Sequence, residues 1–444
     1  MITVGLDFGT HQTKICIENN EDVELSYEFF KFKDTLGNEQ YVLPSVIGIS
    51  EDDCLMYGYL DNKDTENEKN NIINQLKSLN KIFKIKVSSK KKKIKEIHKY
   101  FKQVTFSGVN KSQKQEAIYY SVWYISYLLF LLKEKYGDDF RIQMGVPADG
   151  EHFQERRNLA VRIMLSAYRL VEDVLQNDKK KFLSLSVQKL KKITNIVEYD
   201  EEKRYYYQIL VFPEAYACLM PLTSTDKISS GMSIMVDIGG GTTDISFFTI
   251  KNKRPQVYDF YSIDKGLNYL VEIDEINNKD RFDGNLSSLT KFNFNRKEDL
   301  FRNITQIHSQ IVDRLRKEFH EQCSYLSMQN LMDALESRPI IYTGGGSTFG
   351  DLRKKYSGFN DIIHVSDSAW QSRYIKNIQE IRQKGLAPIL STSYGLSINV
   401  SNDDISCEKF DDIFENIKKH HPKIDKMNRG GMAGDSFDYA HLEG

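Results

Sequence analysis

Two short segments far apart in the chain share one pattern, and this pattern limits the possible folds more than any other feature. Each segment runs through an apolar stretch, an Asp, a turn rich in Gly and Thr, and a second apolar stretch. The first is GLDFGTHQTK, Gly5–Lys14, and the second is MVDIGGGTTDISFF, Met235–Phe248. Apolar runs on both sides of a glycine turn predict a strand, a tight turn and a second strand. We therefore expect two related β-hairpins.

The residues at these turns have the chemistry that binds a polyphosphate. Glycine has no Cβ, so phosphate oxygens can approach the backbone N–H groups of the turn closely. An Asp at the end of a strand can hold Mg²⁺, usually through the water shell of the ion. Two such hairpins facing each other would hold the phosphates of a nucleoside triphosphate from both sides.

Length and composition favour a globular protein of two or three domains. The chain has 444 residues, of which 40 % are hydrophobic and 28 % charged, so disorder is not expected and packed cores are. Lys and Arg total 61, and Asp and Glu total 62. This balance gives no overall attraction to nucleic acids or membranes, and direct binding to either is not expected.

The cysteines and the apolar segments favour a cytoplasmic protein. Five cysteines are scattered without metal-ligand or disulfide-like spacing, which is typical of free thiols in a reducing compartment. No secretory signal is visible at the N-terminus. The longest apolar stretch, Val122–Leu132, is too short to cross a bilayer.

Periodicity along the chain predicts a mixed α/β protein. We expect strands over Ile2–Phe8, Thr13–Glu18, Leu43–Ser50 and Arg141–Ala148, and from the second hairpin to about Ser262. We expect helices over Glu116–Gly137, from about Glu151 to Val174, from Pro213 onwards after the run Tyr205–Phe212, and over most of residues 296–336. Arg338–Leu352 reads as a strand, a Gly-rich turn and a helix.

The segment SSG, Ser229–Gly231, interrupts these patterns just before the second hairpin, and we expect the main domain boundary there. The first lobe would span residues 1–228, with a Lys-rich insert at about 51–110 that contains KKKK, Lys90–Lys93. This insert is either a basic binding patch or a solvated helical insertion. The second lobe would span residues 229–387, and residues 388–444 would form a return segment to the first lobe and a flexible tail.

A third glycine-rich segment, GGGST at Gly344–Thr348, follows the apolar run PIIYT. In their order and spacing the three segments resemble the phosphate-1, phosphate-2 and adenosine motifs of the actin-like ATPase superfamily, which also holds sugar kinases and heat-shock chaperones. The chain looks most like the ATPase part of the seventy-kilodalton heat-shock chaperones, because DIGGGTTD, Asp237–Asp244, closely resembles their second phosphate loop. This resemblance implies two related mixed β-sheet lobes with flanking helices and a nucleotide cleft between them.

Shorter matches to the same chaperones follow in order over roughly residues 1–400. VPA with the following QERR resembles their proline-and-arginine switch segment, PEAYA resembles their connecting helix with its catalytic Glu, SIDKGL resembles the segment after the second loop, and STSYGLSI resembles their closing helix. These matches lie at Val146–Ala148, Gln154–Arg157, Pro213–Ala217, Ser262–Leu267 and Ser391–Ile398.

The resemblance implies a role for each matching residue, with ATP and Mg²⁺ as the ligands. Asp7 and Asp237 would hold Mg²⁺ through water, and Asp244 and Glu214 would position the attacking water or the metal shell. The residues that would cradle the β- and γ-phosphates are Gly9, Thr10, Gly239, Gly240, Gly241 and Thr242. Gly345, Gly346 and Ser347 would lie against the adenosine. For Glu214 alone, an ordinary acid at a helix start, favoured by the helix dipole, explains the residue equally well.

Three departures from the chaperone pattern affect these roles. Lys63 is in a poor context for the phosphate-contacting Lys of the chaperones, but Lys14 has the spacing from Asp7 found in actin and in plasmid-segregation filament proteins. Lys14 is therefore either a phosphate ligand or a lysine on the strand surface. Phe349 stands where the chaperones place an Arg against adenine, and it could stack but not donate a hydrogen bond. The region between Leu267 and Arg338 is shorter, so the residues that contact the base are not assigned.

The C-terminal region also differs, because no apolar interdomain linker and no peptide-binding β-sandwich are recognisable after the closing helix. The segment Asp403–Lys419 has apolar residues at roughly helical spacing. It would be either a docking helix for a partner or a terminal helix that packs on its own domain.

Two functions of different classes fit these patterns. The first is an ATP-binding, ATP-hydrolysing switch whose nucleotide state is read by a protein partner. The second is an actin-like filament-forming ATPase of the plasmid-segregation type, which the position of Lys14 and the shortened second lobe favour. A sugar or acid kinase shares the fold, but no acidic sugar-binding motif is visible.

Overall fold

The computed structural model divides into two compact units. Unit 1 comprises Met1–Val146, His152–Phe212 and Leu396–Asn399, and unit 2 comprises Pro147–Glu151, Pro213–Gly395 and Val400–Gly444. The structure describes residues 2–9, 12–19, 25–34, 36–45, 47–49, 53–59, 111–147, 153–223, 233–251, 254–263, 265–267, 269–271, 294, 296–322, 339–354, 362–365, 370 and 374–398.

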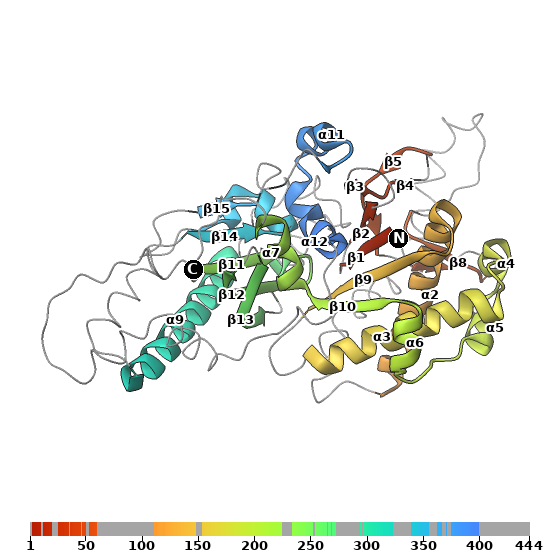
Figure 1. Ribbon diagram of the computed structural model, residues 1–444, viewed down its shortest axis with the longest axis horizontal. Helices are drawn as coiled ribbons and strands as arrows, with labels where there is room; N and C mark the ends of the chain where they lie inside the picture. Colours follow the sequence, from red (N-terminus) through yellow and green to blue (C-terminus); the bar gives the residue numbers. More distant parts are fainter. Residues whose placement is uncertain are drawn as a thin grey trace, which may run out of the picture. The chain divides into compact units, whose positions relative to one another are not determined.

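Unit 1 is built on a mixed sheet in which five strands follow the order β10-β9-β1-β2-β3, with β6 paired to β2 (Figure 1). β1 lies at the centre, antiparallel to β2 and parallel to β9. All seven residues of β1 are buried, as expected for a strand covered on both faces. The strands are β1 Ile2–Phe8, β2 Gln12–Asn19, β3 Ser26–Phe29, β6 Leu43–Pro44, β9 Phe140–Val146 and β10 Ile209–Pro213.

The helices of unit 1 begin and end at residues with ordinary capping chemistry. Asp178, Ser186 and Asp200 each accept a backbone N–H at the start of a short helix. Gly137, with φ of +76°, ends the long helix α2. The remaining elements are the helices α2 Lys111–Tyr136, α3 Phe153–Arg169, α4 Lys179–Ser184, α5 Val187–Ile193 and α6 Glu201–Tyr206, the π-helical turn η2 Leu170–Val174, and the short strands β4 Phe32–Lys33, β5 Glu39–Gln40, β7 Ile47–Ile49 and β8 Leu55–Tyr57.

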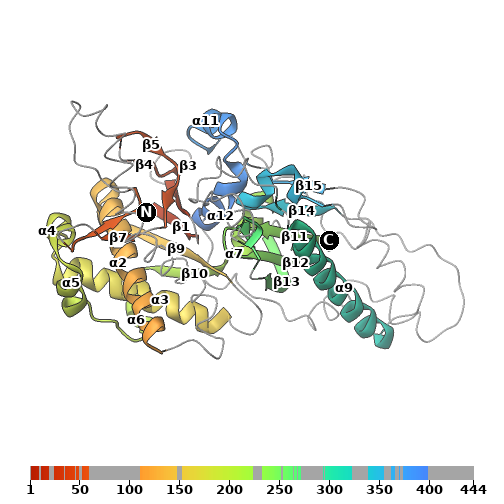
Figure 2. The same cartoon turned by 180° about the vertical axis from the view of Figure 1, so that it is seen from behind.

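The core of unit 1 joins the sheet to α2 and α3, which contact each other (Figures 1 and 2). Trp123 of α2 is 2 % exposed, and its indole N–H donates to Thr194 Oγ1 at 2.8 Å. This bond satisfies the polar atom that burial of the ring removes from water. At the end of the described chain, residues 396–399 return to unit 1.

Unit 2 is built on a five-stranded sheet with the order β13-β12-β11-β14-β15. Its strands are β11 Ser233–Ile238, β12 Thr243–Lys251, β13 Arg254–Ile263, β14 Ile340–Thr343 and β15 Ile362–His364. Its helices are α7 Glu214–Thr223, α9 Lys297–Gln322, α11 Ile378–Gln383 and α12 Ala387–Ser397, and two 3₁₀ turns, η4 Gly345–Thr348 and η5 Gly350–Leu352, follow β14. In both views, one end of α9 projects beyond the sheet (Figures 1 and 2).

The two sheets repeat one topology. In each, three antiparallel strands come first in the chain, and the first of them pairs in parallel with the fourth. When the strands are numbered by their place in the chain, β3-β2-β1-β9-β10 and β13-β12-β11-β14-β15 therefore both have the spatial order third, second, first, fourth, fifth. Each unit also has its own buried apolar cluster. The expectation of a mixed α/β chain is confirmed, and the repeat extends from the two hairpins to five strands of each sheet.

Several boundaries differ from those predicted. The long apolar helix begins at Lys111 rather than Glu116. The run Tyr205–Phe212, which received no element from the sequence, is divided between the end of α6 and the strand β10. The Gly-rich turn is the 3₁₀ turn η4, and in place of the helix expected after it the chain forms only a second 3₁₀ turn, η5. The division between the units falls at Phe212 and Pro213, before the SSG segment, because α7 contacts β12 and β13.

Some predicted features lie outside the described residues. They include most of the Lys-rich insert with Lys63 and Lys90–Lys93, the segment Asp403–Lys419, and the glycine-rich tail. Within the described part of the chain, Cys16, Cys54 and Cys218 form no disulfide. None of the described helices is long and apolar enough to cross a membrane.

Candidate functional site

The first hairpin brings Asp7, Gly9 and Lys14 together in unit 1. Asp7 and Lys14 stand directly opposite each other on β1 and β2, and their side chains form an ion pair of 2.7 Å. The side chains are only 7 % and 12 % exposed. A Cβ on Gly9 would lie 3.0 Å from Lys14 Nζ, so this ammonium reaches the turn rather than the outer surface of the strand. Thr10 lies outside the described residues.

The second hairpin repeats this register in unit 2. Asp237 and Asp244 stand opposite each other on β11 and β12, as Asp7 and Lys14 do in the first hairpin. Both connections run over four residues, 9–12 and 239–242, between the last paired residues of the strands. An Asp, a Gly and a Thr therefore recur at equivalent places, and the residue opposite the Asp changes from Lys to Asp.

Each glycine turn is held from outside in the same way. The Gly9 carbonyl accepts from Ser45 Oγ at 2.7 Å, and the same Ser45 lies 3.0 Å from the hydroxyl of Thr13. In unit 2 the equivalent Gly239 carbonyl accepts from the Leu267 N–H at 3.0 Å. The next segment of the chain thus fixes the first glycine of each turn, which pre-organises the loop.

Residues 265–267 form the support of the second turn. Thr243 Oγ1 donates to the Lys265 carbonyl at 2.8 Å. A Cβ on Gly266 would lie 2.5 Å from the backbone N of Thr242 and 2.6 Å from the Gly239 carbonyl oxygen. Only glycine allows the two backbone segments to come this close. The SIDKGL segment, singled out in the sequence by its resemblance alone, therefore has a direct structural link to the turn.

Thr242 and Asp244 contact each other at the end of this turn. Thr242 Oγ1 donates to Asp244 Oδ2 at 3.1 Å. The bond orients the Asp244 carboxylate, and it places the Thr242 hydroxyl within the hairpin. Gly240 and Gly241, the other glycines of this turn, are half-buried.

The third glycine segment packs directly behind Asp237. Gly344 has φ of +83°, and a Cβ there would lie 2.0 Å from Asp237 Oδ1 and 2.7 Å from the Ile238 carbonyl oxygen. A Cβ on Gly346 would lie 2.3 Å from Ile238 Cγ2. These glycines leave the space that the Asp237 carboxylate and the end of β11 occupy. The predicted second and third motifs are thus in contact within unit 2, whereas Gly345 is only half-buried beside them.

Ser347 is fully buried, with its hydroxyl used inside the protein. Ser347 Oγ donates to the Gly344 carbonyl at 2.8 Å and lies 3.1 Å from His364 Nε2. Burial, with a smaller effect of the Arg353 charge, lowers the pKa of His364 to about 4. A neutral imidazole therefore packs beneath the 3₁₀ turn, so any contact of Ser347 with a nucleoside would be made by its backbone.

Phe349, the residue expected to replace an adenine-contacting Arg, is half-buried. Its ring lies 5.4 Å from that of Phe294, centroid to centroid, at an interplanar angle of 59°. Phe294 is 5 % exposed and belongs to the core of unit 2. This packing fixes the Phe349 ring next to the third glycine segment, with part of it exposed.

Helix α7 brings Glu214 and Cys218 to the same region of unit 2. Glu214 is the first residue of α7 and is half-buried. Cys218 lies one turn further on and donates from Sγ to Asp237 Oδ2 at 3.3 Å. Cys218 Sγ also lies 2.9 Å from Thr392 Oγ1 of α12. Burial, with a further contribution from the Asp237 charge, raises the pKa of the Cys218 thiol well above its usual value.

Several of these residues were not found from the sequence. Gly266 and Thr392 lie in segments that the resemblance had marked, SIDKGL and STSYGLSI, but neither residue received a role. Cys218 and His364 contact the predicted motifs through the fold, and their own sequence contexts are ordinary. Gly344 is the exception, because it stands in the GGG run and its position next to the strand end could have marked it. Among the described residues, no group of three or more His, Cys, Asp or Glu is arranged to hold a metal.

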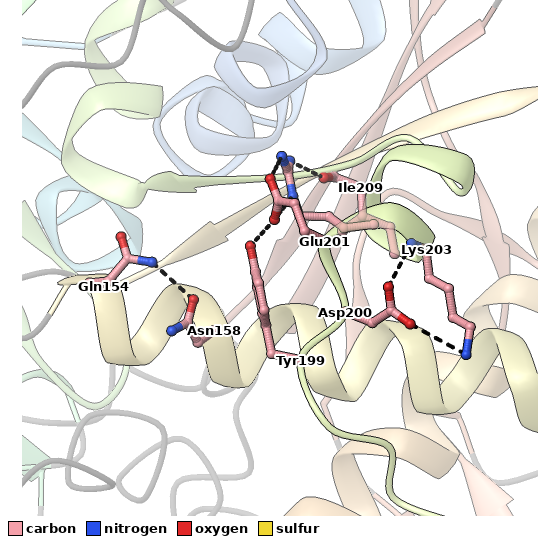
Figure 3. A network of polar contacts seen from close by, with 8 residues as sticks. Gln154, Asn158, Tyr199, Asp200, Glu201, Lys203 and Ile209 are labelled. Carbon is pink, nitrogen blue, oxygen red and sulfur yellow. Dashed lines mark hydrogen bonds and ion pairs between the residues drawn. The ribbon is translucent and has the colours of Figure 1, made fainter.

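A separate polar network in unit 1 surrounds the N-terminus of α6 (Figure 3). Arg204 is 2 % exposed, and its guanidinium donates to the Glu201 carboxylate and to the Ile209 carbonyl. The Tyr199 hydroxyl donates to the same Glu201 carboxylate. Lys203 pairs with Asp200 at 3.4 Å. Beside it lies an open pocket of about 420 Å³. The charges of this network pair with one another, and they tie α6 to β10.

No protein-family model matches this chain, and no curated protein is significantly similar to it. The features of this chain that bear on its function are the two hairpins, the third glycine segment and the contacts that they make.

Proposed function

We propose that this protein is an ATP-binding, ATP-hydrolysing two-lobed switch of the actin-like ATPase superfamily, similar to a heat-shock chaperone ATPase domain. The observation that supports this most is the repeated hairpin register, with Asp7 and Asp237 at equivalent positions opposite Lys14 and Asp244. The same strand order in both sheets is what two related lobes would have. In this proposal each unit contributes one phosphate hairpin to the same Mg²⁺–ATP.

The residues present fit a magnesium ion that is held through water. Carboxylate oxygens are hard donors, as Mg²⁺ prefers, and Mg²⁺ commonly keeps several waters and binds one or two carboxylates together with substrate phosphates. The Asp237 carboxylate occupies space that a Cβ on Gly344 would fill, so the fold provides a defined position for this carboxylate. Asp7 and Asp237 would hold the ion, which supplies neutralisation of phosphate charge.

The first hairpin would supply positive charge to the phosphates. Lys14 reaches the turn and is paired with Asp7, so an incoming phosphate would share its ammonium with that carboxylate. Backbone N–H groups of both glycine turns, including those of Gly9 and Gly240, would donate to phosphate oxygens. The Gly239 N–H, which the sequence assigned to the same role, instead donates to the Thr242 carbonyl at 2.8 Å and closes the turn. Phosphoryl transfer needs this positioning and charge neutralisation more than covalent chemistry from the protein.

The second hairpin would supply the carboxylate that acts on water. In hydrolysis, a water oxygen bonds to the γ-phosphorus as the bond to the bridging oxygen breaks, ADP leaves, and the proton of the water passes to a base. Asp244 is oriented by Thr242, and Glu214 lies at the start of α7 in the same unit. We assign the positioning of this water to these two carboxylates.

The adenosine would lie against the third glycine segment. Gly345 is half-buried and offers backbone without a side chain, whereas Gly346 is buried against Ile238, and Phe349 offers part of an aromatic ring held by Phe294. A ring can stack on a purine without choosing it by hydrogen bonds. We propose that the nucleotide is ATP. We also propose that a protein partner distinguishes the ATP-bound from the ADP-bound protein.

The proposal is tested with Asp7→Ala and Asp237→Ala. We expect the wild-type protein to bind one Mg²⁺–ATP in calorimetry and to hydrolyse it slowly, and both variants to lose Mg²⁺-dependent turnover while their circular dichroism is unchanged. Asp313→Ala, which removes an acid of α9 with a side chain 75 % exposed, is the control and should behave as wild type. Absence of Mg²⁺–nucleotide binding by the wild-type protein at high micromolar concentration would refute the proposal.

A filament-forming ATPase is the second candidate, and the position of Lys14 favours it. Lys14 has the spacing from Asp7 that resembles the phosphate-contacting Lys of actin and plasmid-segregation proteins, and its ammonium pairs with Asp7 and reaches the turn. Filaments need subunit faces that repeat by an open helical operation. Pelleting and light scattering with Mg²⁺–ATP separate the two candidates, since a protein that stays monomeric at tens of micromolar is not a filament former.

A further inference from the structure

We propose that Cys218 and Thr392 are positioning residues that set the orientation of the Asp237 carboxylate, and through it the affinity for divalent cation. This inference deepens the proposed function and rests on it. The two residues come from different helices, α7 and α12, and both contact the strand end that carries Asp237 through one chain of bonds.

The direction of the two bonds follows from the chemistry of the thiol. A thiol has one hydrogen, and Cys218 donates it to Asp237 Oδ2 at 3.3 Å. The sulfur can then only accept from Thr392, whose hydroxyl oxygen lies 2.9 Å away. The order Thr392 to Cys218 to Asp237 is therefore fixed, and it runs toward the carboxylate.

On the side opposite the thiol, the backbone of Gly344 lies against the Asp237 carboxylate. A Cβ on Gly344 would lie 2.0 Å from Asp237 Oδ1, so one oxygen faces the glycine and the other faces the thiol. Rotation of the carboxylate away from this place would break the bond to Cys218. Cys218 is fully buried and Thr392 is 8 % exposed, so water does not readily replace either of them.

The choice of sulfur has a chemical consequence. A thiol is a weak donor, and it holds the carboxylate in place while it removes little of its negative charge. Asp237 thus keeps its attraction for a cation. A stronger donor such as a hydroxyl would preserve the orientation and compete more with the water shell of the ion.

The test measures how nucleotide affinity depends on Mg²⁺ in the wild type, Cys218→Ala and Cys218→Ser. Titration of a fluorescent ATP analogue at a series of Mg²⁺ concentrations gives the concentration for half-maximal binding. Outer-shell partners of metal ligands are typically worth about 10- to 100-fold in affinity, and we expect about 3- to 10-fold for Cys218→Ala because the ion is held through water. Affinity without Mg²⁺ should not change, and Cys218→Ser should recover most of the loss.

Two further variants separate orientation from packing. Cys16→Ala removes a second fully buried thiol, in β2 of unit 1, and should match Cys218→Ala in lost thermal stability without a change in Mg²⁺ dependence. Thr392→Val keeps the volume and removes the hydroxyl, and should raise the Mg²⁺ requirement by less than Cys218→Ala does. Binding of Mn²⁺, followed by electron paramagnetic resonance, should weaken in the same order.

The outcomes distinguish this inference from the proposed function. If the wild type binds Mg²⁺–nucleotide and Cys218→Ala shows the same Mg²⁺ dependence, the inference is wrong and the proposed function stands. If Cys16→Ala changes the Mg²⁺ dependence as much as Cys218→Ala, the effect is general packing and the inference is also wrong. If the wild type binds no Mg²⁺–nucleotide, both are wrong.

Discussion

At the scale of single residues, the candidate site depends on glycines that leave room for a carboxylate. Gly344 and Gly385 both have positive φ, but a Cβ on Gly344 would meet Asp237, and a Cβ on Gly385 would meet nothing within 4 Å. We expect Gly385→Ala to lose about 1 kcal/mol of unfolding free energy from its backbone alone. Gly344→Ala adds a collision and should lose about 2 to 5 kcal/mol. Urea unfolding of the two variants measures the difference. Equal losses of unfolding free energy would contradict the inference that Gly344 leaves room for the Asp237 carboxylate.

His364 gives a second prediction at this scale, on pH. Its pKa in the folded protein is about 4, below the ordinary value of 6.5, so the unfolded chain takes up a proton at higher pH than the folded one. The stability that the neutral imidazole contributes is therefore complete above pH 6.5 and is lost as the pH falls toward 4. Between pH 7 and pH 5, wild type should lose more stability than His364→Gln in urea unfolding. The pKa of His308 is also lowered by burial, but it titrates in both proteins and cancels in the comparison.

At the scale of elements, the sequence was sufficient where the signal is local. The strands of both hairpins, α2 and α7 were predicted because apolar periodicity and glycine turns act within a few residues of each other. The contact of Cys218 with Asp237 and that of Gly266 with Thr242 join segments that are distant in sequence. No local pattern marks them, so they could not be predicted. After the Gly-rich turn that follows β14 a helix was predicted, but the chain forms only the 3₁₀ turn η5 there.

A close approach of the helices α7 and α12 in unit 2 leads to a prediction on helix packing. A Cβ on Gly395 of α12 would lie 1.8 Å from the Ala217 carbonyl oxygen of α7. Gly→Ala inside a helix normally stabilises by about 0.5 to 1 kcal/mol. Here the collision should reverse the sign and cost about 1 to 3 kcal/mol. Thermal or urea unfolding of Gly395→Ala measures this, and a stabilised variant would show that α12 can move away from α7 without loss.

At the scale of the whole molecule, the repeat of one sheet topology is matched by a difference in charge. Each unit has a hairpin with Asp and Gly at equivalent positions. The residue opposite the Asp is Lys14 in unit 1 and Asp244 in unit 2. In the function that we propose, the Lys of one unit and the Asp of the other would supply the two charges that hydrolysis of a phosphoanhydride needs, one for the phosphate and one for the water.

If one Mg²⁺–ATP binds both hairpins, as we propose, it should protect the amides of both hairpins from hydrogen exchange together. In hydrogen exchange followed by mass spectrometry, Mg²⁺–ATP should slow exchange in peptides covering residues 5–14 and 235–244 with the same concentration dependence. Asp237→Ala changes only unit 2, yet it should abolish protection in both peptides, because binding to both hairpins stabilises the same complex. A peptide from α4 and α5, far in sequence from both hairpins, serves as the internal control. If the first hairpin stays protected in Asp237→Ala, unit 1 binds nucleotide by itself, and the shared Mg²⁺–ATP that we propose does not exist.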